Sequence, residues 1–130
     1  MTTVCKDKTE IEIKEAADPV SEEEEVVICR LCSSAVTRPF HRIMVNNSFS
    51  HAFANPHGHV FEIACFTKAE GCVPVSDFSS EFTWFPGYSW KIGACTGCAA
   101  HLGWVFSLDN PGSDNIKLFY GLILDKLIFP

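Results

Sequence analysis

The sequence has no long hydrophobic run. No stretch approaches the roughly 20 consecutive apolar residues of a membrane-spanning helix, and Met1 to Glu15 lack the apolar centre of a secretory signal peptide. We therefore expect no membrane partner and a cytoplasmic location, with the nucleus as the alternative. Thiols stay reduced there, and the odd count of seven cysteines agrees with metal ligands better than with a disulfide framework.

Basic residues are few as well. The chain has 10 Lys and Arg against 16 Asp and Glu, for a formal net charge of −6. No basic run or stripe is present that could neutralise a phosphate backbone, which argues against nucleic-acid binding.

Aromatic residues are missing from one end of the chain. Residues 1–25 contain three Lys and nine Asp or Glu but no Phe or Trp. A segment with so little apolar surface cannot offset the entropy of ordering its backbone. We predict an acidic, disordered tail over residues 1–25 and one folded domain over residues 26–130.

Helical periodicity is weak throughout the predicted domain. Short β-branched and aromatic segments at residues 25–28, 59–66, 103–108 and 119–124 alternate with turns rich in Pro, Gly and Asn. This pattern predicts a mainly antiparallel β fold.

Four cysteines form two close pairs, Cys29-x-x-Cys32 and Cys95-x-x-Cys98, separated by a long segment. Each C-x-x-C turn presents two thiolates to one centre, and two such turns complete a tetrahedral four-cysteine site, the usual arrangement of structural zinc. His101 could replace one ligand, but four thiolates already fill the coordination shell.

Cys5, Cys65 and Cys72 remain, and we expect them to be non-catalytic thiols, because no basic residue in the local sequence obviously lowers a thiol pKa. Cys65 lies in a buried-looking strand, where Cys acts as a small hydrophobe. Cys72 follows Gly71 in a predicted turn and is expected to be exposed. Gly93 and Gly97 are expected to relieve crowding around the second metal-ligating pair.

Trp84, Trp90 and Trp104 are the only tryptophans. Trp84 and Trp90 flank a Pro-Gly turn, so their rings can face one point from a loop, and Trp104 follows closely after Cys98. A single Trp is more often part of a core, but this arrangement favours a shared pocket. Aromatic pockets hold cations such as methylated lysine, or flat neutral rings whose polar edge contacts main-chain groups, and composition leaves both possibilities open.

Four motifs together are specific. They are Asn55-Pro56-His57-Gly58, Trp84-Phe85-Pro86-Gly87-Tyr88-x-Trp90, Cys95-x-x-Cys98-x-x-His101-x-Gly103-Trp104-x-Phe106, and Phe119-Tyr120-Gly121-Leu122. With both Cys pairs, they resemble the thalidomide-binding (CULT) domain of the cereblon family over essentially all of the predicted domain.

The resemblance implies a β-tent fold, in which two antiparallel sheets meet near one structural zinc held by Cys29, Cys32, Cys95 and Cys98. It also implies a ligand pocket walled by Trp84, Trp90 and Trp104, with Phe106 at its base. The edge of a glutarimide ring would contact the carbonyl of Phe82 and the amide N–H of Trp84. Asn55, Pro56 and His57 would lie at the rim.

The sequence departs from the family pattern at three places. Phe82 replaces the usual His, and His59 replaces the usual Tyr. The N-terminal Lon-like region, which docks the adaptor of a cullin-type ubiquitin ligase in cereblon, is missing. We therefore expect a single-domain member that does not dock this adaptor.

These observations predict a binding module without catalytic activity. Its ligand would be a cyclic imide: the glutarimide of thalidomide-type drugs, a uridine-like ring, or a protein C-terminus cyclised to an imide. One alternative is an oxidoreductase like methionine sulfoxide reductase B, with Cys65 or Cys72 as the reactive thiol. Another is a methyl-lysine reader, with Glu81 contributing a carboxylate.

Overall fold

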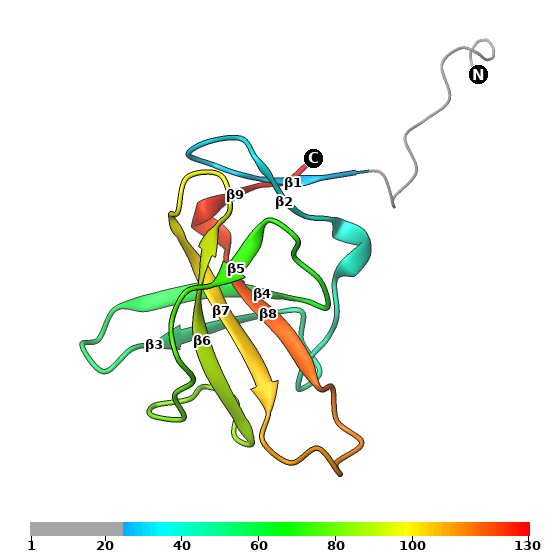
Figure 1. The fold of residues 1–130 in the computed structure, drawn as a ribbon, viewed down its shortest axis with the longest axis vertical. Helices are drawn as coiled ribbons and strands as arrows, with labels where there is room; N and C mark the ends of the chain where they lie inside the picture. The colour runs from blue at the N-terminus through cyan, green and yellow to red at the C-terminus, as the bar shows by residue number, and fades with distance from the viewer. Residues whose placement is uncertain (1–24) are drawn as a thin grey trace, which may run out of the picture.

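The computed structural model describes residues 25–130, which form nine strands and two short 3-10 helices (Figure 1). The elements in chain order are β1 (Val27–Cys29), β2 (Ala35–Thr37), η1 (Pro39–His41), β3 (Ser50–Ala54), β4 (Val60–Phe66), β5 (Cys72–Pro74), β6 (Tyr88–Cys95), β7 (His101–Leu108), β8 (Leu118–Ile123), η2 (Leu124–Lys126) and β9 (Leu127–Ile128). Apart from Glu25, the predicted acidic tail lies outside the described residues.

The strands form two sheets in which every neighbouring pair is antiparallel. The small sheet has the order β2-β1-β9 and the large one the order β3-β4-β8-β7-β6-β5. Figure 1 shows the small sheet above one end of the large sheet. The predicted fold class, mainly β with two antiparallel sheets, is confirmed.

The β6–β7 hairpin is the longest pairing of the large sheet. Its register runs from Tyr88↔Leu108 to Ala94↔His101, with an irregularity after Gly93. Because side chains alternate along a strand, Trp104 and Phe106 of β7 share one face of this hairpin. Trp90 of β6 lies directly opposite Phe106 and therefore joins the same face.

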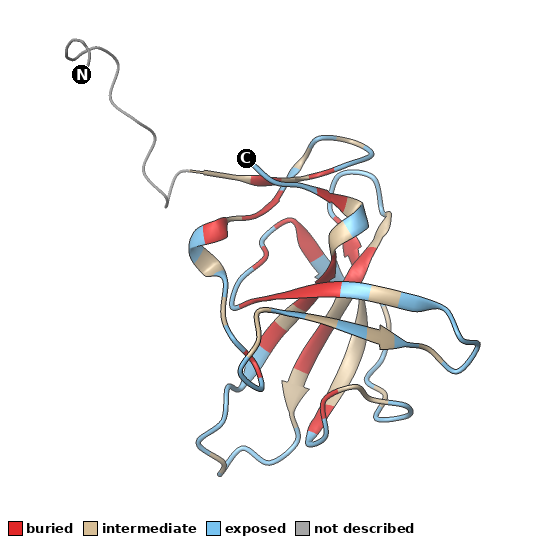
Figure 2. Cartoon of the chain, turned by 180° about the vertical axis from the view of Figure 1, so that it is seen from behind, coloured by how far each residue is buried: buried red, intermediate tan, exposed pale blue. Residues whose placement is uncertain are grey.

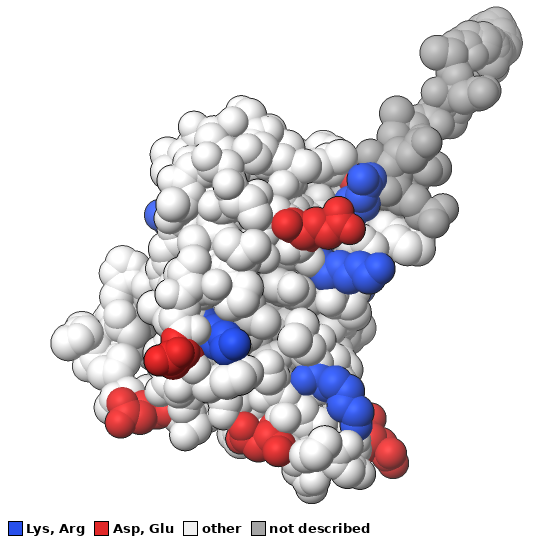
Figure 3. Space-filling model, viewed as in Figure 1, with Lys and Arg blue, Asp and Glu red and all other residues white. Residues whose placement is uncertain are grey.

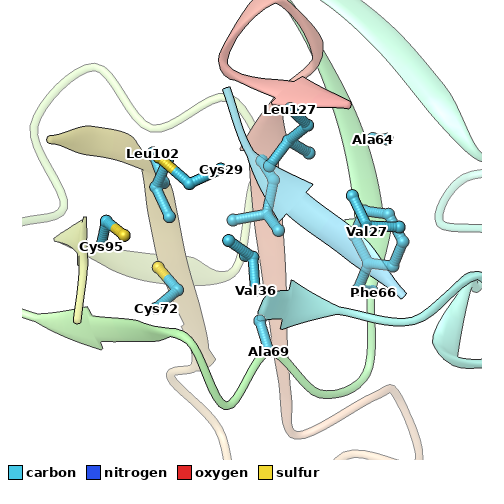
Figure 4. Packing of buried hydrophobic residues seen from close by; sticks show 11 residues of the cluster. Val27, Cys29, Val36, Ala64, Phe66, Ala69, Cys72, Cys95, Leu102 and Leu127 are labelled. Carbon is cyan, nitrogen blue, oxygen red and sulfur yellow. The ribbon is translucent and has the colours of Figure 1, made fainter. Parts of the chain in front are cut away.

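The interior consists of two clusters of buried side chains. One lies between the sheets and includes Val27, Val36, Phe66, Leu102 and Leu127 (Figure 4). The other lies on the opposite side of the large sheet and consists mainly of aromatic and branched residues: Ile63, Phe85, Tyr88, Phe106, Phe119 and Ile123 with Val45 and Cys65. Figure 2 shows the buried positions concentrated along the central strands.

Two predictions about local structure were wrong. The segment around Trp90 was expected to be a loop, but Trp90 lies within β6, which begins directly after the Pro-Gly turn. Cys72 was expected in an exposed turn, but it begins β5, pairs with Cys95 and is only 3% exposed. In both places, long-range strand pairing prevails over the local turn signal of the preceding glycine.

The surface of the described residues carries scattered charges. On the face shown in Figure 3, Lys and Arg side chains stand apart from one another, with Asp and Glu among them. Each helix in the described part of the chain has three residues, and neither could cross a membrane.

Gly71 joins the two sheets through its backbone, and we expect Gly71→Ala to destabilise the protein. Its amide donates to Val36 O of β2 (2.9 Å). A Cβ at this position would overlap the carbonyl oxygen of Ala35 and lie 2.6 Å from Cα of Val36, and backbone atoms cannot yield cheaply. Overpacking of this kind costs about 1–3 kcal/mol, measurable by thermal or denaturant unfolding.

The matched control is Gly112→Ala. A Cβ on Gly112 would meet only Asn110 Oδ1, at 3.4 Å. The change in unfolding free energy should stay within about 0.5 kcal/mol. Equal stabilities of the two variants would contradict the role given to Gly71.

Candidate metal centre and aromatic pocket

The four paired cysteines lie close together at one end of the structure. Their sulfur atoms all lie within 4.8 Å of one another. The Sγ atoms of Cys29 and Cys98 are 3.8 Å apart, and those of Cys32 and Cys95 are 3.6 Å apart. These separations are far too long for disulfides. They match the roughly 3.8 Å between sulfurs of a tetrahedral site with metal–sulfur bonds of about 2.3 Å, so the donor set fits a metal ion.

The two C-x-x-C turns share one backbone geometry. In the first turn, Ser33 has φ +65° and donates its amide to Cys29 O at 2.8 Å. In the second, Ala99 also has φ +65° and donates to Cys95 O at 2.9 Å. A local motif repeated in sequence therefore produces the same thiolate pair twice.

The surroundings favour a thiolate at Cys32 but not at Cys98, where the hydrogen bond with the Ala100 backbone is outweighed by burial and by the bonds with the other three cysteines, which raise the pKa of Cys98 to about 11. Hydrogen bonds with the hydroxyl and then the backbone of Ser34 lower the pKa of Cys32 to about 6. The amide of Gly97 donates to Cys95 Sγ at 3.3 Å. A Cβ on Gly97 would overlap Ser34 Oγ and lie 3.0 Å from Cys32 Sγ, so the predicted need for glycine at this position is confirmed.

The first cysteine turn is also attached to the C-terminal strand. Arg30 donates from Nε to Asp125 O (3.0 Å) and from a terminal nitrogen to Leu127 O (3.2 Å). Arg30 thus links the turn to β9.

The other described cysteines are buried away from solvent. Burial raises the pKa of Cys65 to about 12. Burial, with a smaller contribution from the neighbouring Cys95, also raises the pKa of Cys72 to about 12. Neither thiol is therefore a thiolate at neutral pH, which is the form that reacts as a nucleophile.

A pocket of about 500 Å³ opens on the side of the large sheet that carries the tryptophans. Its lining consists of Asn55, Pro56, Phe61, Ser79, Glu81, Phe82, Trp84, Trp90, His101, Trp104 and Phe106. Of the predicted ligand-binding residues, only His57 is not in the lining: it is exposed in the turn before β4, where its amide donates to Asn55 Oδ1 at 3.0 Å.

The three tryptophans reach the pocket from different kinds of structure. Trp90, Trp104 and Phe106 project from the β6–β7 face, while Trp84 closes the pocket from the loop that follows β5. The rings of Trp84 and Trp104 meet edge to face, with centroids 4.7 Å apart and planes at 75°. The predicted convergence of the indoles is present, but a sheet provides two of them.

Aromatic neighbours hold these rings in place. Phe53 of β3 stacks on Trp84 with centroids 5.1 Å apart and planes at 11°. Phe61 and His101 each meet Trp104 edge to face, at 5.2 and 4.9 Å. Phe61 was not predicted to line the pocket, and its only signal in the sequence is its place in the largely apolar segment Val60–Phe66.

Two of the indole N–H groups donate to main-chain carbonyls. Trp84 Nε1 donates to Ala54 O at 3.0 Å, and Trp90 Nε1 donates to Glu81 O at 2.9 Å. Within residues 25–130, Trp104 Nε1 has no hydrogen-bond partner.

The loop of residues 81–84, which these two indole hydrogen bonds contact, exposes unpaired main-chain groups. Phe82 has φ +55°, an uncommon conformation for a bulky residue, and its side chain is 73% exposed at the pocket. Neither the carbonyl oxygen of Phe82 nor the amide of Trp84 has a hydrogen-bond partner in the described part of the chain. One acceptor and one donor are therefore available beside the aromatic rings.

The pocket contains little charge. Burial lowers the pKa of His101, with the hydrogen bond between its Nε2 and Gly103 O (3.0 Å) acting in the opposite direction. His101 is therefore neutral at pH 7. Among the described residues that line the pocket, Glu81 alone is charged.

No family model matches this sequence. Among curated proteins, the chain is 32% identical over 106 residues to protein cereblon of Drosophila pseudoobscura pseudoobscura and 31% identical over 103 residues to that of Drosophila melanogaster. It is 36% identical over 77 residues to protein cereblon of Gallus gallus. These alignments cover 79%, 77% and 59% of the chain but only 17% of each relative.

We expect removal of one clustered cysteine to abolish metal binding. Cys95→Ala should reduce the metal content from one ion per chain to nearly none and lower the unfolding midpoint, because binding to a closed thiolate site contributes folding free energy. Elemental analysis of the purified chain and a thermal melt measure both quantities.

The matched control is Cys65→Ala, which removes a buried thiol outside the cluster. This variant should keep one metal ion per chain. Retention of a full equivalent of tightly bound metal by Cys95→Ala would refute the four-cysteine site.

Proposed function

Because the chain carries a cereblon-related domain, we propose that its aromatic pocket binds a small cyclic imide and catalyses no reaction. The observation that carries this proposal is the unpaired pair of main-chain groups, the Phe82 carbonyl and the Trp84 amide, beside three convergent indoles. The ligand would be a glutarimide, a uridine-like ring or a peptide whose C-terminal Asn or Gln has cyclised.

An imide edge presents a carbonyl, an N–H and a second carbonyl in a row. The imide N–H can donate to Phe82 O while a neighbouring imide carbonyl accepts from the Trp84 amide. Both partners belong to the backbone, so the replacement of the family's usual His by Phe82 does not remove them. An analogue without the N–H would leave a pocket carbonyl unpaired, at a cost of about 1–3 kcal/mol.

The saturated carbons of the ring require an apolar enclosure. Trp84, Trp90 and Trp104 supply it, with Phe106 beneath them at 1% exposure. Burial of apolar area contributes about 25 cal/mol per Å². The low charge of the pocket also suits a neutral ligand better than an anionic one.

We propose that the four-cysteine site holds one structural zinc ion. Zinc prefers closed tetrahedral thiolate sites, and all four ligands come from the protein, which leaves no open position for substrate. The ion would act by connecting the first cysteine turn, beside β9, to the β6–β7 hairpin that carries two of the indoles.

The burial and raised pKa of Cys65 and Cys72 argue against a thiol-based oxidoreductase. One observation favours a second candidate function, the binding of methylated lysine: the carboxylate of Glu81 lines the aromatic pocket. Because the alignments span a small share of the cereblon proteins, docking of a ubiquitin-ligase adaptor is not carried over to this chain.

Glutarimide should quench the tryptophan fluorescence saturably, because all three tryptophans line the pocket. N-methylglutarimide should bind roughly 5- to 150-fold more weakly, since it cannot donate to Phe82 O. Equal affinity for the two compounds would refute recognition of the imide edge, and saturable binding of a trimethyllysine peptide alone would favour the second candidate.

Trp84→Ala should weaken glutarimide binding by about 2 kcal/mol or more, roughly 30-fold, because it removes one wall of the pocket. Isothermal titration calorimetry measures this loss. The variant should keep one metal ion per chain, which shows that the domain remains folded. Unchanged affinity in a folded Trp84→Ala variant would place the ligand elsewhere.

A further inference from the structure

The loop that presents the Phe82 carbonyl and the Trp84 amide lies between two indole hydrogen bonds. We propose that the N–H groups of Trp84 and Trp90 position this loop for ligand binding, so that both residues act as positioning residues as well as pocket walls. This inference rests on the proposed function and specifies what holds the loop in the conformation that an imide edge would contact.

Trp90 fixes the first half of the loop. Its backbone exchanges two hydrogen bonds with Ser79, at 2.8 and 2.9 Å, and its indole donates to Glu81 O at 2.9 Å. The hydroxyl of Ser79 accepts from the Glu81 amide at 3.1 Å. The Trp90 indole therefore holds the carbonyl of Glu81, immediately before Phe82, while Ser79 holds the amide of the same residue.

Trp84 fixes the other end. Its indole donates to Ala54 O at 3.0 Å, at the last residue of β3, and its ring stacks on Phe53 of the same strand. The two indole hydrogen bonds hold the loop from opposite sides of the large sheet. Ala54 ends β3, which is one edge strand, whereas Trp90 lies in β6, the strand next to the other edge strand. The loop is thus held across the pocket opening.

The conformation of Phe82 shows why such anchors are needed. A left-handed backbone is unfavourable for Phe, and the exposed side chain contributes little packing that could maintain it. If the loop were free, it would leave this conformation, and the ligand would have to restore it on binding. Holding the loop in advance removes this cost from the binding free energy.

Trp104 provides a matched comparison. It lines the same pocket and contacts Trp84, but within residues 25–130 its Nε1 has no hydrogen-bond partner. A change that removes only an indole N–H should therefore reduce affinity more at Trp84 and Trp90 than at Trp104.

The experiment replaces each tryptophan singly with 3-benzothienylalanine in the full chain, which exchanges the N–H for sulfur and keeps the fused ring. Affinity for glutarimide is measured by calorimetry. The Trp84 and Trp90 replacements should each bind roughly three- to tenfold more weakly, the value of one hydrogen bond. The Trp104 replacement should lose clearly less affinity than either of these, because Nε1 of this pocket residue has no hydrogen-bond partner within residues 25–130. Equal losses at all three positions, or no loss at any, would overturn the proposal.

A second measurement needs no ligand. Backbone amide order parameters of residues 81–84 should fall from about 0.85 towards 0.6 in the Trp90 replacement and stay high in the Trp104 replacement. An equally rigid loop in both would overturn the positioning role. If the unmodified chain fails to bind glutarimide, the proposed function falls, whereas this measurement still decides whether the indole hydrogen bonds order the loop.

Discussion

The arrangement of the domain depends on the convergence of four cysteine sulfurs where the two sheets meet. Cys29 ends β1 of the small sheet, and Cys95 ends β6 of the large one. The turn that begins at Cys95 leads into β7, which carries Trp104 and Phe106, so one of the strands that support the pocket starts next to the metal-ligating turn. Gly71 reinforces the same junction, since it accepts from the Thr96 amide at 2.9 Å while donating to β2. The sulfur cluster and the pocket therefore both include residues of the β6–β7 hairpin.

The parts of this structure that the sequence predicts correctly are those determined locally. A C-x-x-C turn needs only a few adjacent residues, and the left-handed Ser33 and Ala99 occupy equivalent places in both copies. Strand β4 is predictable because its seven residues are mostly apolar and include Val60, Phe61, Ile63 and Phe66, which are types enriched in strands. The three-residue strands β2 and β5 are too short for a periodic signal, and they form by pairing with β1 and β6, which are distant or separate elements that no local pattern identifies.

The pocket shows the same division between local and long-range information. Its tryptophans are recognisable from a motif, but their placement on a sheet depends on the pairing of Trp90 with Phe106, which no local pattern encodes. The left-handed Phe82 and the unpaired groups beside it also depend on contacts from distant strands, such as the carbonyl of Ala54. Residue types thus identify the ligand-binding region, while long-range hydrogen bonds determine which polar atoms in it are left unpaired.

The position of the tryptophans has a consequence for how the molecule is observed. All three line one pocket, and the small sheet contains neither Trp nor Tyr. Intrinsic tryptophan fluorescence therefore reports chiefly on the pocket and hardly at all on the small sheet. Separation of β1, β2 and β9 from the rest could proceed with almost no change in fluorescence, and a reporter placed near Leu31, which is 70% exposed between Cys29 and Cys32, would be needed to see it.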